Sequence, residues 1–396
     1  MSDWKKIPGG VLAPLDFLGG AAMCGIKTGK KIRYDLALVA SLRPCSAAAT
    51  FTTNRVKAAP VLVSMEHLAG SPTHRAVALN SGNANACTGP DGIKAARATA
   101  VAAADKLGCQ PAEVFVCSTG RIGRPLPTAR LAAGLREIEL ERDSGPACAK
   151  AIMTSDTVPK EISIRVGEGR ESFRIGAMAK GAGMIDPNMA TMLCLVTTDA
   201  VLPTGALRRM LRDAVADSFN RITIDGDMST NDTVIALANG ASGHRPPDSR
   251  FAAALAFVLR HLARAIVLDG EGVSRFVTVD VRGAASKADA KRAAEAVANS
   301  TLVKCAWAGG DPNWGRILDA LGYCGAEFSP DRVDVDYDAV PAVRGGLPAP
   351  TPPARLKKVA AREEFRVTIR LGAGDASHEV WTTDLTEEYV RLNLSE

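Results

Sequence analysis

Short apolar runs alternate along the chain with longer segments in which apolar residues recur every three or four positions. The short runs predict buried β-strands, and the longer segments predict amphipathic helices. This alternation favours the α/β class of folds. In the N-terminal half we expect strands at residues 36–41, 58–64, 75–79, 114–117 and 192–196.

Capping residues and chain breakers help to define three helices between and after these strands. An alanine-rich helix is expected at residues 92–107, with Asp91 as its N-cap. A second helix is expected at about residues 206–220. A third is expected at about residues 250–268 and begins after Asp248.

The pattern changes after Arg282, so we place a domain boundary near residue 285. Residues 1–285 are expected to form a catalytic α/β domain and residues 286–396 a smaller C-terminal α/β domain. Residues 341–353 are rich in proline and glycine and predict a long surface loop. The remaining expected elements are strands at residues 276–281, 332–337, 364–371 and 379–383, and helices at residues 287–298, at 313–321 and from Thr386 onward.

Composition narrows the class of protein. A chain of 396 residues is too long for one small core, so two or three packed units are expected. Apolar residues make up 46% and charged residues 23%, which is typical of a soluble globular protein. The net charge of +5 is mild and the basic residues are scattered, so we expect no nucleic-acid partner.

The nine cysteines do not form a recognisable framework. Their number is odd, no C-x-x-C pair occurs, and Cys117 and Cys194 stand inside apolar runs. They are typical of small core residues in a reducing compartment.

No targeting or membrane segment is recognisable. The first ten residues lack the apolar stretch of a signal peptide. The longest apolar segment, residues 251–268, is interrupted by Arg260, His261 and Arg264, so we expect no membrane span. A cytoplasmic protein is predicted.

Residues 180–200, KGAGMIDPNMATMLCLVTTDA, carry the candidate chemistry. A glycine-rich run leads to Pro187, and Thr191 stands directly before an apolar strand. This order can hold the Ala190–Thr191 peptide bond in a strained turn with the threonine hydroxyl against its carbonyl. Cleavage would give Thr191 a free amine, a built-in base of a kind known to activate a weak hydroxyl nucleophile. A threonine at the start of a strand is also an ordinary β-former.

The sequence lacks the motifs of competing chemistries. It contains no G-x-S-x-G elbow and no P-loop, and Gly181-Ala182-Gly183 lacks the third glycine of a dinucleotide fingerprint. None of the five histidines pairs with another at ligand spacing. We therefore expect neither a histidine triad nor a bound metal.

Four further segments have both a structural and a functional interpretation. Residues 117–120 (CSTG) follow a strand and can form either a plain turn or an oxyanion hole. Residues 80–89 can approach a substrate or form capping turns. Residues 225–232 hold three carboxylates, which suits a cation loop less well than a network of Asx turns. Glu271 lies between two glycines and can meet a cationic substrate or stand exposed in a turn.

Taken together, these segments resemble the ArgJ family, the ornithine acetyltransferases also called arginine biosynthesis bifunctional proteins. The resemblance implies an α/β sandwich of the DmpA/ArgJ-like type that cleaves itself into an α chain (residues 1–190) and a β chain that begins at residue 191. The cleaved pairs are expected to assemble further, as a heterotetramer. The motifs run in order through nearly the whole chain: GVLAP, GIKTGKKIRYDLALVAS, NSGNANACTG, VCSTGRIGRPLP, AIMTSDTVPK, KGAGMIDPNMATML, GDMSTNDTVIALANG, DGEGVSRF and GDPNWGRILDALGY.

The resemblance also implies roles for single residues. Thr191 would be the nucleophile with its new amine as the base, and Thr119 and Gly120 would form the oxyanion hole. Lys180 would hold the α-carboxylate of the substrate and Glu271 the side-chain ammonium of ornithine. The substrate-binding positions of the family fall on Thr157, Lys180, Thr191, Glu271 and Asn393.

The implied reaction is ping-pong transfer. N2-acetylornithine acetylates Thr191, ornithine leaves, and glutamate takes the acetyl group. No cofactor is expected, although some members of the family use acetyl-CoA as the acetyl donor. The alternatives left open are a self-processing aminopeptidase or amidohydrolase and an unprocessed, non-catalytic homologue.

Two positions depart from the family pattern. The family commonly ends in Asn-Ala-x-Tyr-x-Thr, whereas here Asn393 is followed by Leu394-Ser395-Glu396. Asp186 places an acid close to the expected cleavage site, where a small residue is the norm. Both departures concern residues near the implied chemistry.

Overall fold

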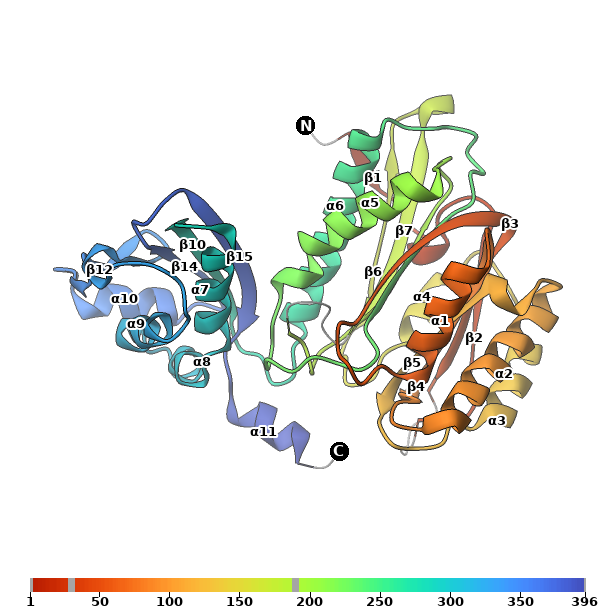
Figure 1. Ribbon diagram of the computed structural model, residues 1–396, viewed down its shortest axis with the longest axis horizontal. Helices are drawn as coiled ribbons and strands as arrows, with labels where there is room; N and C mark the ends of the chain where they lie inside the picture. The colour runs from red at the N-terminus through yellow and green to blue at the C-terminus, as the bar shows by residue number, and fades with distance from the viewer. Residues whose placement is uncertain (1–2, 28–32, 187–191, 395–396) are drawn as a thin grey trace. The chain divides into compact units, whose positions relative to one another are not determined.

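The computed structural model describes residues 3–27, 33–186 and 192–394. The chain divides into two compact units, each combining helices with a β-sheet, so the predicted α/β class is confirmed (Figure 1). Unit 1 comprises Met1–Gly181, Asn188–Asn220 and Met228–Ile266, and unit 2 comprises Ala182–Pro187, Arg221–Asp227 and Val267–Glu396.

Unit 1 is built on a sheet that folds over itself. Its strands follow the order β1 (Trp4–Lys6), β6 (Lys160–Val166), β7 (Phe173–Lys180), β8 (Leu193–Thr198), β9 (Thr233–Ala238), β3 (Leu36–Phe51), β4 (His74–Asn83) and β5 (Val114–Arg121), and β2 (Phe17–Ala22) also pairs with β3. The strand β3 has 16 residues and joins two halves of this sheet. Its residues 36–40 pair with β4 in the half that contains β2, β4 and β5, and its residues 46–51 pair with β9 in the half that contains β1 and β6 to β9. Its register shifts between Ala40 and Cys45, around Pro44, which has no N–H to donate.

The two halves of this sheet pack face to face. Val39 and Phe115 from one half share a hydrophobic core with Leu195 and Ile235 from the other. These positions alternate with side chains that point to the opposite face of each strand, as the two-residue period of a strand requires. The inner core also receives Cys148 from helix α4 (Gly145–Ala151).

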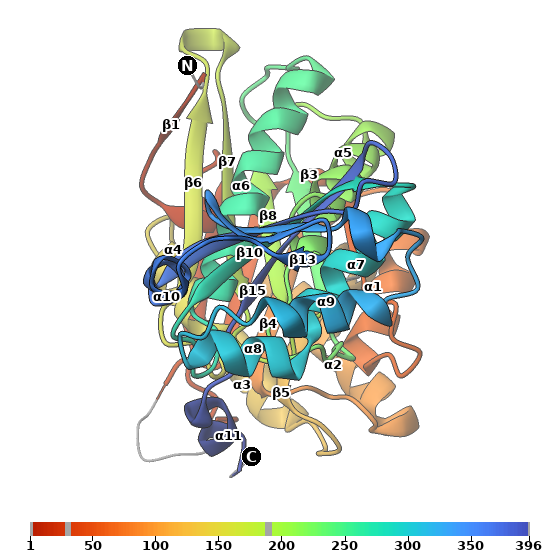
Figure 2. The same ribbon diagram turned by 90° about the vertical axis from the view of Figure 1, so that its left-hand side faces the viewer.

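Helices cover the outer faces of this sandwich. Helices α1 (Ala59–Gly70), α2 (Gly89–Leu107) and α3 (Thr128–Glu137) pack on the half formed by β3, β4 and β5. Helices α5 (Thr204–Ala216) and α6 (Asp248–Leu268) lie along the other half (Figure 1, Figure 2). The rings of Phe251 on α6 and Phe173 on β7 are 5.6 Å apart. The result is the α/β sandwich that the resemblance to the ArgJ family implies.

Within the described ranges, α6 is the one helix long and apolar enough to cross a membrane by length and composition, and half of its most apolar window is buried inside the protein. Leu255, Val258 and Leu259 on this helix are fully buried. A buried core helix passes the same test of length and hydropathy, so α6 needs no membrane to explain its composition.

Unit 2 is smaller and has its own core. Its sheet has the order β13 (Leu347–Pro348), β12 (Val340–Arg344), β11 (Asp334–Tyr337), β14 (Glu364–Arg370), β10 (Phe276–Ala284) and β15 (Ala376–Thr383). The core includes Trp307, Tyr337 and Phe365. The helices of the unit are α7 (Lys287–Asn299), α8 (Thr301–Ala308), α9 (Trp314–Gly322), α10 (Pro353–Ala360) and α11 (Glu387–Asn393).

The strand predicted at residues 58–64 is wrong, because this segment begins helix α1. Pro60 stands in the first turn of the helix, where the backbone N–H that proline lacks would have no partner within the helix. A short apolar run has no periodicity that separates a strand from a buried helix.

Three other details differ from the sequence prediction. Residues 341–353 are not one loop, because β12 and β13 form a short hairpin there. Residues 117–120 are not a turn, because β5 continues to Arg121 through its parallel pairing with β4. Helix α2 begins at Gly89, so Asp91 lies in its first turn and is not the N-cap.

The domain boundary near residue 285 stays a prediction. Strand β10 precedes that position yet belongs to the sheet of unit 2, where it pairs with β14 and β15. Residues 182–187 and 221–227 also belong to unit 2. Unit 2 is therefore made of three separate segments of the chain, and a single boundary cannot divide the chain into these two units.

Replacing Trp307 with alanine is predicted to lower the free energy of unfolding by about 3–5 kcal/mol, since a fully buried indole is lost and a cavity remains. The neighbouring Leu302 on α8 is 55% exposed, so Leu302→Ala is the matched control and is expected to change stability by about 0.5 kcal/mol at most. Urea unfolding of both variants measures the difference, and equal stabilities would contradict this core assignment.

Candidate active site

Thr119 and Gly120 lie at the end of β5, beside the end of β4. Gly120 has a φ of 127°, and a Cβ added to it would lie 2.4 Å from the carbonyl carbon of Gly82. Only glycine permits this approach of two backbones. Thr119 is 4% exposed, so its hydroxyl-bearing side chain is held inside unit 1.

The side chain of Asn231 secures the peptide that precedes Thr119. Its Nδ2 donates hydrogen bonds to the carbonyls of Ser118, at 2.8 Å, and Ala84, at 2.7 Å. The hydroxyl of Ser118 in turn donates to Oδ1 of Asn80 at 2.6 Å. Because the C=O and N–H of one peptide share a plane, these contacts set the direction of the Thr119 N–H as well.

A buried cluster of charges surrounds Lys180 at the end of β7. Oδ1 of Asp156 lies 2.7 Å from Nζ of Lys160, and Oδ2 of Asp156 lies 4.0 Å from Nζ of Lys180. The N–H of Gly181 also donates to Asp156 at 2.7 Å. Burial alone would raise the pKa of Asp156, but the two lysines and this N–H lower it to about 2. Asp156 is therefore a carboxylate that keeps Lys180 in place.

Thr157 follows Asp156 directly and is exposed on the surface of unit 1. Its neighbour Asp156 accepts the N–H of Thr154 at 2.9 Å, so the backbone of this turn is fastened to the charge cluster. Thr119, Gly120, Thr157 and Lys180 all belong to unit 1.

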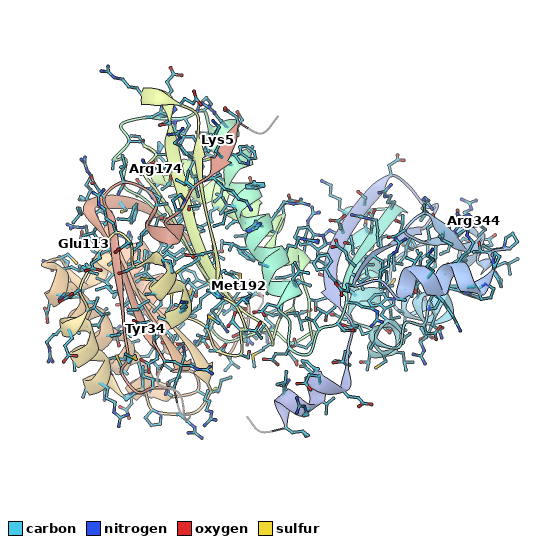
Figure 3. All side chains as sticks on the ribbon, turned by 180° about the vertical axis from the view of Figure 1, so that it is seen from behind. Lys5, Tyr34, Glu113, Arg174, Met192 and Arg344 are labelled. Carbon is cyan, nitrogen blue, oxygen red and sulfur yellow. The ribbon has the colours of Figure 1, made fainter. Side chains whose placement is uncertain are left out.

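Asp232 is the second buried carboxyl of this region. It is fully buried and lies directly before β9. Its Oδ1 accepts the N–H of Met192 at 2.9 Å, and Met192 is labelled in Figure 3. Its Oδ2 is buried and has no hydrogen-bond partner among the described residues. Burial raises the pKa of Asp232 well above its ordinary value.

In unit 2, Glu271 and Asn393 lie together. The Nδ2 of Asn393 donates to Oε2 of Glu271 at 2.9 Å. The backbone N–H of Glu271 donates to the carbonyl of Ala182 at 2.8 Å. A Cβ on Gly183 would lie 2.6 Å from the carboxyl group of Glu271, so a side chain at this position would displace that carboxyl group. The two predicted substrate-binding residues of this unit therefore share one hydrogen bond.

Asp225 holds the glycine-rich segment in unit 2. Its carboxylate accepts the N–H groups of Met184, at 2.6 Å, and Ile185, at 2.8 Å, and the hydroxyl of Tyr389 at 3.2 Å. Met184 has a φ of 55°, a conformation that costs free energy for a residue with a side chain. The carboxylate thus secures a strained backbone close to the expected cleavage site.

Residues 225–232 make local hydrogen bonds typical of Asx and related turns. The N–H of Asp227 donates to Asp225 at 3.2 Å, and the N–H of Asn231 donates to the Ser229 hydroxyl at 3.0 Å. Among the described residues, no group of three histidine, cysteine or acidic side chains is placed to hold a metal ion.

Asp186 is partly buried in unit 2. Its Oδ1 accepts a hydrogen bond from Nδ2 of Asn299 at 3.0 Å. Burial raises the pKa of Asp186 to about 6, with a smaller contribution from the charge of Glu295, while Asn299 opposes the rise. The hydrogen bond from Asn299 to Asp186 therefore adds to the bonds by which Asp225 holds Met184 and Ile185, the residues that precede Asp186.

The structure describes some of the predicted site residues and not others. Ala190 and Thr191 lie outside the described residues, as does Ser395. The assigned roles of the other site residues stay predictions. Sequence reasoning did not identify Asp156, Asn231 and Asp232 as site residues. Asn231 and Asp232 stand in the polar run STND, and a polar run gives no sign that its side chains are buried.

Comparison with known proteins gives a clear result. The model of the ArgJ family matches residues 19–395. The arginine biosynthesis bifunctional protein ArgJ of Symbiobacterium thermophilum is 47% identical over 98% of both chains. The glutamate N-acetyltransferase of Methanocaldococcus jannaschii is 42% identical, again over 98% of both chains.

The chain belongs to the ArgJ family. The resemblance stated from the motifs is thus confirmed. The prediction of an acyltransferase is confirmed as well, since one relative is named arginine biosynthesis bifunctional protein ArgJ and the other glutamate N-acetyltransferase. Among solved structures, ornithine acetyltransferase of Mycobacterium tuberculosis complexed with ornithine is 40% identical and covers 46% of this chain and 98% of its own, with a TM-score of 0.42.

Asp156→Asn is predicted to destabilise this ArgJ-family protein by about 3–5 kcal/mol at pH 7, because it leaves two lysines in a buried site without their carboxylate. The folded-state pKa of Asp156, about 2, lies below the ordinary value of 3.8. Its contribution is therefore present above pH 4 and is lost as the pH falls toward 2, by about 2 kcal/mol.

Urea unfolding at pH 7, 5 and 3 measures this effect. The difference between wild type and Asp156→Asn should shrink at pH 3. The control is Asp91→Asn, since the side chain of Asp91 is 90% exposed and its pair with Lys94 adds little. A constant difference at all three pH values would contradict the assignment.

Proposed function

We propose that this chain is a self-processing glutamate N-acetyltransferase of arginine biosynthesis that transfers the acetyl group of N2-acetylornithine to glutamate. The observation that carries the proposal is similarity over 98% of the chain to proteins named for this pathway and this activity. The buried side chain of Lys180, held beside Asp156, supports it, because a lysine in such a place can bind the carboxylate of an amino-acid substrate.

Self-processing would break the bond between Ala190 and Thr191. The hydroxyl oxygen of Thr191 attacks the carbonyl carbon of Ala190, the C–N bond breaks, and water then hydrolyses the resulting ester. The fastening of the flanking backbone supports this step, since Asp225 holds Met184 and Asp232 holds Met192. A peptide bond whose flanks are fixed can meet its nucleophile in a defined orientation.

Acetyl transfer would follow a ping-pong course. Lys180 would hold the α-carboxylate of acetylornithine, and Glu271 would receive its side-chain ammonium. The Thr191 hydroxyl attacks the acetyl carbonyl while the new amine takes its proton, and Thr119 and Gly120 stabilise the oxyanion. Ornithine leaves with that proton, and the amine of glutamate then removes the acetyl group from Thr191. Acetyl-CoA is proposed as a second donor, and no cofactor is required.

Assembly and location are part of the same proposal. The α and β chains would stay associated, and two such pairs would form a heterotetramer. A biosynthetic enzyme that acts on free amino acids in a reducing environment suits the cytoplasm, and the nine cysteines, none of which forms a disulfide in the described residues, are compatible with this compartment.

Intact mass spectrometry tests the processing step. The purified protein is expected to give two chains, residues 1–190 and 191–396, and to produce acetylglutamate and ornithine from acetylornithine and glutamate. Thr191→Ala should stay uncut and inactive, while Thr301→Ala, at an exposed threonine of α8, should be cut and active. Release of acetate without acetylglutamate would favour a hydrolase, and an intact, inactive wild-type chain would favour a non-catalytic homologue.

A charge test addresses the substrate. Glu271→Gln is predicted to raise the KM for acetylornithine about 10- to 100-fold, because one charge-assisted hydrogen bond to its ammonium is lost. The KM for glutamate should not rise, since glutamate has no side-chain cation. Initial rates with each substrate varied in turn measure both constants, with Glu387→Gln, an exposed acid on α11, as the control. Equal rises in both constants would contradict the assigned role of Glu271.

A further inference from the structure

Lys27 is a half-buried lysine of unit 1 whose ammonium group is held by backbone carbonyls. Its Nζ donates hydrogen bonds to the carbonyl of Tyr34 at 2.7 Å and to the carbonyl of Ala151 at 3.4 Å, and Tyr34 is labelled in Figure 3. Among the described residues it forms no ion pair with a carboxylate. A lysine has three N–H donors, so one donor and the whole positive charge are left for an anion.

The backbone at Lys27 is fixed by a buried carboxylate. Asp35 is fully buried, and its side chain accepts the N–H groups of Cys24 and Ile26, each at 2.6 Å. It also accepts the N–H of Lys27 at 3.3 Å. The direction in which the Lys27 side chain leaves the backbone is therefore set by the fold.

Lys27 packs against the end of β4, the strand that pairs with the predicted oxyanion-hole residues. A Cβ on Gly82 would lie 3.0 Å from the backbone nitrogen of Lys27 and 3.1 Å from its Cγ. Gly82 is the strand partner of Gly120. The hydroxyl of Ser81, the preceding residue, donates to the same Ala151 carbonyl that accepts Lys27. The ammonium group is thus tied to the strand end beside the candidate active site.

The charge cluster at the end of β7 also acts on Lys27. Burial lowers the pKa of Lys27 to about 8. The carboxylates of Asp35 and Asp156 oppose this fall, whereas the charges of Arg33 and Lys180 add to it. Lys27 is still mainly protonated at pH 7, so Lys27 and Lys180 place two positive charges within electrostatic reach of each other.

The second half of the proposed reaction needs a further cation. Glutamate carries two carboxylates, and Lys180 would take one of them. Glu271, the proposed partner of the ornithine ammonium, would repel the other, because like charges disfavour each other. Acetylornithine has a single carboxylate and makes no such demand.

We propose that Lys27 binds the second carboxylate of the acceptor glutamate and thereby determines which amino acid receives the acetyl group. This inference rests on the proposed function, since it takes transfer of the acetyl group to glutamate as given. An ammonium and a carboxylate form a charge-assisted hydrogen bond, which is about twice as strong as a neutral one. Glutamine, which has an amide in place of that carboxylate, would not receive this contribution.

Acetyl transfer from acetylornithine to glutamate and to glutamine, measured with the purified enzyme, tests the proposal. Lys27→Met keeps the length of the side chain and removes its charge. The kcat/KM for glutamate should therefore fall about 10- to 100-fold relative to the kcat/KM for glutamine. The kcat/KM for acetylornithine should stay within threefold of the wild-type value, whereas a general structural defect would lower all three constants together.

Two further variants serve as controls. Lys106 on α2 is exposed, and its Nζ also donates to a backbone carbonyl, that of Arg136 at 2.8 Å. Lys106→Met should leave the preference for glutamate over glutamine within twofold of the wild-type preference. Lys27→Arg keeps the positive charge and should retain most of the preference. Melting temperatures show which variants are folded.

The outcomes separate this inference from the proposed function. A folded Lys27→Met enzyme that keeps the wild-type preference for glutamate would overturn the role of Lys27, while a wild-type enzyme that acetylates neither acceptor would overturn the proposed function. If Lys27→Met does not fold, the wild-type preference is measured from pH 7 to pH 8.5. Loss of the Lys27 proton should reduce the preference about three- to fourfold over this range, and a level preference refutes the proposal.

Discussion

The side chains of three aspartates accept backbone N–H groups on both sides of residues 187–191 in the sequence. Asp156 receives the N–H of Gly181, Asp225 receives that of Met184, and Asp232 receives that of Met192. A buried carboxyl group loses its hydration and recovers that free energy only through donors of this kind. The path of the chain into and out of the candidate active site therefore depends on three acids, each placed by a different part of the fold.

The same acids connect the chain path to the chemistry. Asp156 also neutralises Lys180, so the group expected to meet a carboxylate is placed by the interaction that fixes Gly181. Asn231, the neighbour of Asp232, secures the peptide before Thr119. In unit 2, Glu271 is bonded to the backbone at Ala182 while Asn393 contacts its carboxylate. Within each unit, the same contacts therefore position both the backbone and the charged side chains of the candidate site.

Much of this arrangement was predictable from the sequence, and the remainder depends on distant contacts. The glycine beside Thr119 and the glycine-flanked Glu271 are visible as local motifs because tight backbone approaches require specific residues. The roles of Asp156, Asn231 and Asp232 depend on partners up to 147 positions away, such as Ala84 for Asn231. No local pattern expresses such a pairing. Helix α1 and the hairpin of β12 and β13 were missed for a related reason, since short apolar or proline-rich runs take their form from what they pack against.

The order of strands in unit 1 has a consequence for a chain with a cut after residue 190. Strands β8 and β9 would belong to the second product, yet β7 flanks them on one side and β3 on the other, and both of these belong to the first. Each product would complete the sheet of the other along two rows of backbone hydrogen bonds. Dilution could not part them, and their separation would be an unfolding event.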